Sequence, residues 1–261
     1  KFQNNSNLIV YGNIQILGTK NNPVTITNVD NSKSSIIGIS TDDENKILYT
    51  KFENLSSLEH KGWINSGAIT FYESNIVIKN SSFLDNKEGD DYLNIVRTAS
   101  YFIGDCDFNN SLFDAIDIDF SNGIIVNSTF NNIGDDAIDF SGSTTDVRDC
   151  IFSNCKDKVV SCGESSFINI SNCSISSSRF GIVSKDFSDV KSFNNEFIDN
   201  EYDYSVYKKK DEFGAGKLVD IGSSGEISIL LGVNSIFKTD NIDTTVVKIS
   251  SLINQYILLD N

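Results

Sequence analysis

The stretch DCDFNNSLFDAIDIDFSNGIIVNSTFNNIGDDAIDFSGSTTDVRDCIFSN (residues 105–154) contains one short pattern three times. In each copy, an Asn or Asp is followed three positions later by a phenylalanine. The pattern extends in both directions, at spacings of 25, 22, 22, 23 and 22 residues, through a column of six apolar residues: Phe83, Phe108, Phe130, Phe152, Ile175 and Phe197. A repeat of this length, made of short β-prone runs without a helical stretch, is typical of a solenoid of stacked coils.

One aromatic residue and one Asn or Asp per coil suit a right-handed parallel β-helix. The ring would stack inside, and the polar side chain of a buried Asn ladder would bond turn backbone in the neighbouring coil. We therefore predict an all-β fold, a single-stranded right-handed parallel β-helix (solenoid) of about nine coils of about 22 residues, over one domain, 1–261. Residues 1–65 read as looser N-terminal coils, 66–210 as regular coils, and 211–261 as C-terminal coils or a cap.

Composition narrows the classes of partner. Asp and Glu number 36 against 21 Lys and Arg, which gives a net charge of −15. Nucleic acid and anionic membrane surfaces are therefore excluded as expected partners, because the long-range field repels them. The longest apolar runs are far shorter than the roughly 18 residues that a membrane span needs. The sequence has no Met, so we expect it to be one part of a larger chain.

Three of the five cysteines share one position of the repeat: Cys106, Cys150 and Cys173. We expect them to be buried as small apolar residues. Adjacent coils lie roughly 4.8 Å apart, so a bridge between Cys150 and Cys173 stays open as an alternative. An odd number of cysteines without a CxxC motif argues against a disulfide framework or a zinc site.

A second column gathers acidic residues. Ile116, Ile138, Val160 and Ile182 recur every 22 residues as inward positions, so their strand neighbours point outward. This register predicts an outward acidic face made of Asp114, Asp117, Asp119, Asp136 and Asp139, with Asn94 beside it. Around that face the register places Arg97, Lys158, Glu164 and Lys185, and Tyr207 follows in the next coil.

Like charges stacked on adjacent strands are destabilising, and Asp is a poor strand residue, so this face needs an explanation. One explanation is catalysis, since two carboxylates about 5 Å apart divide into an acid and a base or nucleophile. A second is a Ca²⁺ site built on Asp117, Asp119 and Asp139. The third is a solvated acidic face whose charges are offset by neighbouring Lys and Arg.

Several runs resemble a family of bacterial right-handed β-helix repeat proteins: DDYLNIVR (90–97), FDAIDIDFSNG (113–123), GDDAIDFSGS (134–143), DKVVSCGESS (157–166), FGIVSKDFS (180–188) and YKKKDEFG (207–214). The resemblance covers about residues 8–214. In such proteins this domain is sometimes attached to a spore-coat-kinase-like or lamin-tail-like domain. More distantly, the architecture is similar to that of pectate lyases, polygalacturonases, alginate lyases and phage tailspikes.

The resemblance implies an extracellular or cell-envelope protein that acts on a polysaccharide along an acidic groove, as a hydrolase or a lyase. The catalytic candidates are then Asp117, Asp139, Asp136, Lys158 and Arg97. The substrate-binding candidates are Asp114, Asp119, Asn94, Glu164, Lys185 and Tyr207. In a lyase, Lys158, Lys185 or Arg97 would take the proton from a uronate. The alternative is a non-catalytic module, either a glycan-binding domain or an adhesin or structural β-helix, without a cofactor.

Overall fold

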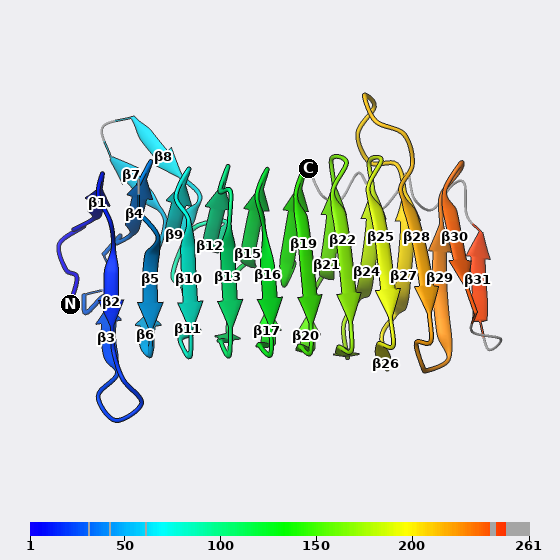
Figure 1. Ribbon diagram of the computed structural model, residues 1–261, viewed down its shortest axis with the longest axis horizontal. Coiled ribbons are helices and arrows are strands. Elements are labelled where there is room, and N and C mark those ends of the chain that lie inside the picture. The colour runs from blue at the N-terminus through cyan, green and yellow to red at the C-terminus, as the bar shows by residue number, and fades with distance from the viewer. Residues whose placement is uncertain (31, 42, 61, 241–243, 249–261) are drawn as a thin grey trace.

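The computed structural model describes residues 1–30, 32–41, 43–60, 62–240 and 244–248, and every regular element among them is a β-strand. The strands form an elongated stack of coils in which the chain advances steadily from one end to the other (Figure 1). Each coil contributes one short strand to each of up to three sheets, and about nine coils result. None of the described residues forms a helix with the length and apolarity that a membrane crossing requires.

Sheet 1 has 11 strands in stacking order: β1 (Leu8–Val10), β4 (Ile36–Ile39), β9 (Gly67–Tyr72), β12 (Asp91–Val96), β15 (Asp114–Asp119), β18 (Ile138–Ser141), β21 (Lys158–Gly163), β24 (Phe180–Lys185), β27 (Tyr202–Tyr207), β29 (Ile227–Leu231) and β31 (Thr244–Lys248). Sheet 2 has 10: β2 (Gln15–Leu17), β5 (Asn45–Leu48), β10 (Ile76–Lys79), β13 (Tyr101–Gly104), β16 (Asn122–Val126), β19 (Thr144–Arg148), β22 (Phe167–Ser171), β25 (Asp189–Phe193), β28 (Lys217–Ile221) and β30 (Ile236–Thr239). Sheet 3 has eight: β3 (Val24–Thr27), β6 (Thr50–Glu53), β11 (Ser82–Leu84), β14 (Asp107–Asn109), β17 (Thr129–Ile133), β20 (Ile151–Cys155), β23 (Ser174–Ser176) and β26 (Glu196–Ile198).

Pairing within the three sheets is parallel, because each strand meets its equivalent one coil later. The exception is a hairpin outside the stack, where β7 (Leu58–His60) pairs antiparallel with β8 (Trp63–Asn65). This hairpin lies between β6 and β9 and lengthens the coil that contains it. The insertion accounts for the wide spacing between Phe52 and Phe83 in the phenylalanine column.

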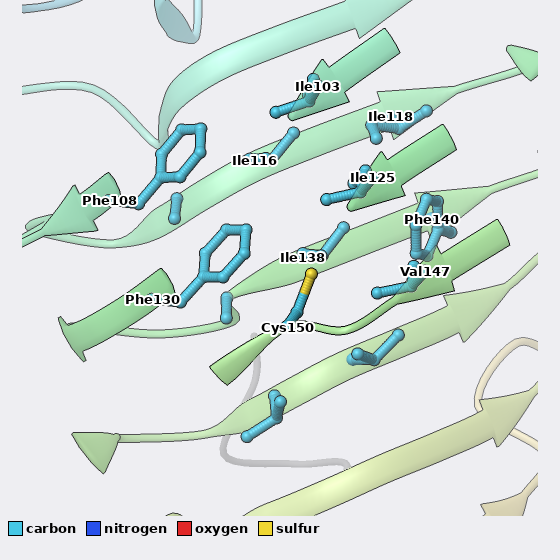
Figure 2. Packing of buried hydrophobic residues seen from close by; sticks show 14 of the residues in the cluster. Ile103, Phe108, Ile116, Ile118, Ile125, Phe130, Ile138, Phe140, Val147 and Cys150 are labelled. Atoms are coloured by element: carbon cyan, nitrogen blue, oxygen red, sulfur yellow. The ribbon is translucent and has the colours of Figure 1, made fainter. Parts of the chain in front are cut away.

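The core is a set of apolar columns inside the solenoid. The predicted phenylalanine column is confirmed: the rings of Phe83 and Phe108 stack with centroids 4.4 Å apart, and those of Phe108 and Phe130 are 4.8 Å apart. Figure 2 shows Phe108 and Phe130 one above the other beside Ile116 and Ile138. Each ring is fully buried, so one residue per coil supplies a continuous apolar stack.

Serine side chains connect the coils where sheet 1 turns into sheet 2. The Ser121 hydroxyl accepts the backbone N–H of Thr98 at 2.9 Å, and the Ser143 hydroxyl accepts the N–H of Ser121 at 3.0 Å. The Ser166 hydroxyl accepts the N–H of Ser143 at 3.1 Å, which continues the ladder. Backbone donors that the strands leave unpaired are thus satisfied inside the wall of the solenoid.

The predicted buried Asn ladder is wrong in one respect. Asn127 and Asn172 are exposed and have left-handed φ angles of 49° and 54°. The amide of Asn172 donates to the Asp149 side chain at 3.3 Å rather than to backbone. The residue that follows each of them carries the inter-coil bond instead, as the Ser128 hydroxyl does by accepting the N–H of Cys106 at 3.2 Å. Asn is needed here because it tolerates the left-handed turn.

The five cysteines are buried and free, as expected for small apolar residues. Cys106, Cys150 and Cys173 occupy the same corner column as Ser128. The thiol of Cys150 donates to the carbonyl of Arg148 at 3.2 Å, in the same way that the hydroxyl of Ser128 donates to the carbonyl of Val126 at 2.9 Å. Thiols therefore replace hydroxyls in this corner.

We expect Phe130→Ala to lower the free energy of unfolding by about 3–5 kcal/mol, because it opens a gap in the aromatic column. Phe167, which is 58% exposed on sheet 2, provides the matched control, and Phe167→Ala should change stability by less than about 0.5 kcal/mol. Urea unfolding of both variants measures the difference. Equal losses would contradict the assignment of the phenylalanine column to the core.

Candidate functional site

The predicted outward column of sheet 1 is confirmed in its register. Asp117 on β15 pairs with Asn94 on β12 and with Asp139 on β18. Their inward neighbours, Ile116 and Ile138, are fully buried in the core. Asn94 is buried, and Asp117 and Asp139 are half-buried, so the two carboxylates retain access to solvent. The alternation of the strands thus turns a sequence repeat into a carboxylate pair on adjacent coils.

Two other aspartates hold backbone together. The carboxylate of Asp114 accepts the N–H of Asp136 at 2.8 Å. The carboxylate of Asp136 in turn accepts the N–H of Lys158 at 2.9 Å, and the Lys158 ammonium lies 3.4 Å from the same oxygen. Asp114 and Asp136 were candidates for substrate binding and catalysis, and their observed contacts are those of residues that connect successive coils.

Polar contacts distinguish Asp117 from Asp139, which together form the central pair of the acidic face. The Asn94 amide donates to Asp117 at 2.9 Å and to Asp91 at 3.3 Å. Asp139 instead lies 3.8 Å from the ammonium of Lys185. One carboxylate therefore faces a neutral donor and other carboxylates, whereas the other faces a cation.

Burial raises the pKa of Asp117 well above its usual range, and the neighbouring carboxylate of Asp91 adds to this shift. The same cause, burial, raises the pKa of Asp119, with Asp139 as the next contribution. Burial also raises the pKa of Asp91 to about 7. Closely spaced carboxylates in a partly dry site cannot all ionise, so this face retains protons near neutral pH.

The side chain of Lys185 reaches Asp139 across an intervening strand. Lys185 is on β24 and Asp139 is on β18, with β21 between them. Gly163 on β21 makes the passage possible, since a Cβ atom there would lie 3.0 Å from Cε of Lys185. Burial lowers the pKa of Lys185, but Asp139, Tyr207 and Asp136 together outweigh it, so the net shift of the pKa is upward and the ammonium stays charged.

Lys185 and Tyr207 were expected to contact substrate from the surface, but both are buried. Tyr207 belongs to a small apolar cluster outside the main core, packed with Phe180, Val183 and Leu230. This cluster covers the outward face of β24, β27 and β29. Lys185 therefore lies beside the carboxylates on the same face, with its ammonium near Asp139, and Tyr207 packs within the apolar cluster.

A family model described as "Right handed beta helix region" matches residues 90–224. This chain belongs to that family. No curated protein matches it. Among solved structures, it is similar to a variant of the catalytic domain of a GH87 α-1,3-glucanase in complex with tetrasaccharides, at 11% identity and a TM-score of 0.47. It is also similar to such a variant in complex with nigerose, at 12% identity and a TM-score of 0.48. In both comparisons the match covers 95% of this chain and 62% of the other, and identities this low say nothing about activity.

Two predicted residues of this right-handed β-helix lie at the margin of the acidic face. Arg97 is exposed in the turn after β12, and within the described ranges it forms no ion pair with the aspartates. Glu164 is half-buried in the turn after β21 and forms an ion pair with Lys210. Both residues follow the last position of their strand, at the corner between sheets 1 and 2, and among the described residues neither forms an ion pair with Asp117 or Asp139.

Two groups of aspartates have carboxylate oxygens close enough to share a cation, and they differ from the predicted Ca²⁺ ligands. In each group the oxygens lie within 4.8 Å of one another, and the groups are Asp114, Asp136 and Asp139, and Asp135, Asp136 and Asp157, so only Asp139 of the predicted set is among them. Ammonium groups already lie near two of these residues, Lys158 at Asp136 and Lys185 at Asp139. These lysines supply the positive charge that a bound cation would otherwise provide.

The set of predicted site residues omitted two aspartates that the fold brings to this face. Asp91 accepts hydrogen bonds from Ser66 at 2.7 Å and from Asn94. Asp157 forms ion pairs with Lys158 and with Arg179, the latter at 3.3 Å. A sequence signal existed for Asp91, because it occupies the same position of the repeat as Asp114 and Asp136.

The raised pKa of Asp91 predicts a pH dependence of stability. Its folded pKa of about 7 exceeds the unfolded value of roughly 3.9, so the folded state binds more protons between these limits. Stability should therefore fall as pH rises from about 4 to about 7. Melting temperatures across this range should decline less in Asp91→Asn than in the wild type. An identical decline in both proteins would contradict the protonation of Asp91.

Calcium provides a second test. Because two lysine ammonium groups already neutralise Asp136 and Asp139, we expect millimolar CaCl₂ or a chelator to leave the melting temperature unchanged. A clear rise with CaCl₂ that disappears in Asp139→Asn would instead support the calcium hypothesis.

Proposed function

We propose that this β-helix hydrolyses a polysaccharide outside the cell, with Asp117 and Asp139 as the reacting pair. The observation that carries the proposal is the difference between two facing carboxylates. Asp117 has a pKa raised by burial and neighbouring carboxylates, while Asp139 lies beside the Lys185 ammonium. A carboxyl group with a raised pKa that faces a second carboxyl group beside a cation is the arrangement that glycoside hydrolysis uses.

In this mechanism protonated Asp117 donates its proton to the glycosidic oxygen as the bond to the sugar carbon breaks. Asp139 assists on the sugar side, either by attacking that carbon or by accepting a proton from the attacking water. Asn94 orients Asp117 through its 2.9 Å hydrogen bond. Lys185 stays protonated throughout and holds Asp139 in place from across Gly163.

The lysines argue for hydrolysis over elimination. A lyase base that removes a proton from a uronate must be neutral at the start of the reaction. Carboxylates raise the pKa of both Lys158 and Lys185 despite their burial, so both amines are charged. Neither lysine is therefore suited to act as the base.

A glycan-binding or adhesin module is the second candidate function. It is favoured by the structural contacts of Asp114 and Asp136, which account for two members of the acidic face without any chemistry. In that case the stacked coils would present a rigid surface that matches the repeating units of a polymer, and no bond would be cleaved.

A screen of neutral and acidic polysaccharides for new reducing ends tests the proposal, and ultraviolet absorbance from unsaturated uronates detects elimination. We expect reducing ends from at least one polymer, and turnover should be lost in Asp117→Asn and Asp139→Asn. Asp117→Asn should keep the melting temperature, because it replaces a carboxyl group that is already protonated. Asp139→Asn should lower it somewhat, because the buried Lys185 ammonium loses its carboxylate partner. Asp146→Asn, an exposed carboxylate on β19 of sheet 2, is the matched control and should keep full activity.

Three outcomes separate the alternatives. Binding without any product would favour the glycan-binding module. Unsaturated products would overturn the hydrolytic mechanism. Full activity in both Asp117→Asn and Asp139→Asn would show that the catalytic site is not on this face.

A further inference from the structure

In each of the six coils that begin with β9, β12, β15, β18, β21 and β24, all three corners have a residue with a left-handed φ angle. At the corner that leads from sheet 2 to sheet 3, the regular coils use only Asn or Asp: Asn80, Asp105, Asn127, Asp149, Asn172 and Asn194. The corner after sheet 3 follows the same preference: Asn54, Asp85, Asn110, Asn132, Asn154 and Asp199, with Ser177 as a departure. Asn and Asp are the non-glycine residues that tolerate this conformation best, so here the sequence matches the backbone.

The corner after sheet 1 follows a different rule. Its left-handed residues are Glu73, Arg97, Phe120, Gly142, Glu164 and Asp186. Four of these six are long or aromatic side chains that gain nothing from this backbone conformation. This corner borders the acidic face, and residues held in an unfavourable backbone region concentrate at functional sites. Within the coils from β9 to β24, the long or aromatic left-handed residues all lie at this corner, whereas Tyr49 has a left-handed φ at the corner after β5.

Phe120 is the most unusual of these residues. It follows Asp119 directly, has a φ of 49°, and is 55% exposed. Its ring lies against the next coil at Gly142, where a Cβ atom would come within 2.6 Å of the ring. The glycine thus lets the ring lie on the backbone of its neighbour with its other side facing solvent.

Phe187, which lies one residue beyond this corner position, also has a left-handed φ angle, 63°, and is exposed to a similar extent, 59%. Its ring lies on Gly214 as the ring of Phe120 lies on Gly142, but it also packs edge-on against Phe213 at 6.2 Å between centroids. Phe120 has no aromatic partner among the described residues, and it follows the half-buried carboxylate of Asp119. A second ring therefore covers part of Phe187, whereas the outer side of the Phe120 ring stays open beside the acidic face.

We propose that Phe120 is a stacking platform for one hexose ring of an uncharged glycan bound across the acidic face. The C–H face of a pyranose ring is apolar and flat, and it matches the exposed side of a phenyl ring, while its hydroxyl groups remain free for polar partners. Arg97 and Glu164 occupy the same corner position one coil before and two coils after Phe120, so they offer a donor and an acceptor for those hydroxyls.

Charge selects the class of glycan. The face next to Phe120 carries Asp117, Asp119 and Asp139, and the chain as a whole has a net charge of −15. A polymer of uronates would be repelled by this field, whereas an uncharged hexose polymer is not. The inference rests on the proposed function, because it assigns a substrate class to the same face.

Binding of four tetrasaccharides tests the platform: α-1,3-linked, β-1,3-linked and β-1,4-linked glucan, and tetragalacturonate. Isothermal titration in an Asp117→Asn background prevents cleavage. We expect at least one neutral tetrasaccharide to bind, and Phe120→Asn to weaken it about tenfold or more. Phe120→Trp should retain binding. Phe167→Asn, which removes an equally exposed phenylalanine from sheet 2, is the control and should bind normally.

The melting temperature distinguishes a binding role from a structural one. Because Asn suits a left-handed turn better than Phe does, Phe120→Asn should melt at the same temperature or higher while it loses affinity. Loss of both affinity and stability would mean that Phe120 only packs the corner, and would overturn the proposal. Unchanged affinity in Phe120→Asn, no binding of any neutral tetrasaccharide, or tighter binding of tetragalacturonate would overturn it as well.

These results are separable from the test of hydrolysis. If binding requires Phe120 but no reducing ends are released, the platform is supported and the hydrolysis is contradicted. If a glycan is hydrolysed equally well by Phe120→Asn, the hydrolysis is supported and the platform is contradicted.

Discussion

The structure depends on hydrogen bonds from the backbone of one coil to a small polar side chain of the next. At each corner the chain turns inside the wall of the solenoid, where an unpaired N–H would be costly. Ser121, Ser143 and Ser166 satisfy these donors in succession. Such a ladder works only if the same residue returns at the same place, so it fixes the coil length near 22 residues. That length sets the register, and the register places Asp117 opposite Asp139.

Much of this arrangement could be predicted from the sequence because apolar columns repeat in every coil. Phe108 and Phe130, like Ile116 and Ile138, identify the inward positions. The carboxylates next to the isoleucines must then point outward, because side chains alternate along a strand. What the repeat does not reveal is which carboxylate bonds to backbone. Asp114 and Asp117 look alike in the sequence, yet only Asp114 accepts an N–H from the next coil. That distinction depends on side-chain direction at a corner, which no periodicity encodes.

The burial of Lys185 and Tyr207 could not be predicted from the sequence for a related reason. The outward face of sheet 1 was expected to be open throughout, but over β24 and β27 it carries its own apolar cluster. Val183 and Tyr207 belong to this cluster. Both are buried although they lie at outward positions, because the apolar side chains of the cluster cover one another. The acidic face is therefore limited to β12, β15 and β18, with one aromatic residue, Phe120, beside it at the corner. A short patch of carboxylates beside an exposed ring is a different surface from a uniform acidic strip.

The reach of Lys185 over Gly163 has a consequence for how such a site diversifies. Asp139 takes its counter-ion from a residue that is 46 positions later in the chain, two coils away. The residues that would meet a ligand and the residue that sets their charge thus belong to different structural modules. Each coil can vary separately as long as its corner ladder is kept. Exchange of the β24 coil alone would then change the counter-ion of Asp139 while the contact surface of the pair stayed the same, which gives this architecture a route to new specificities.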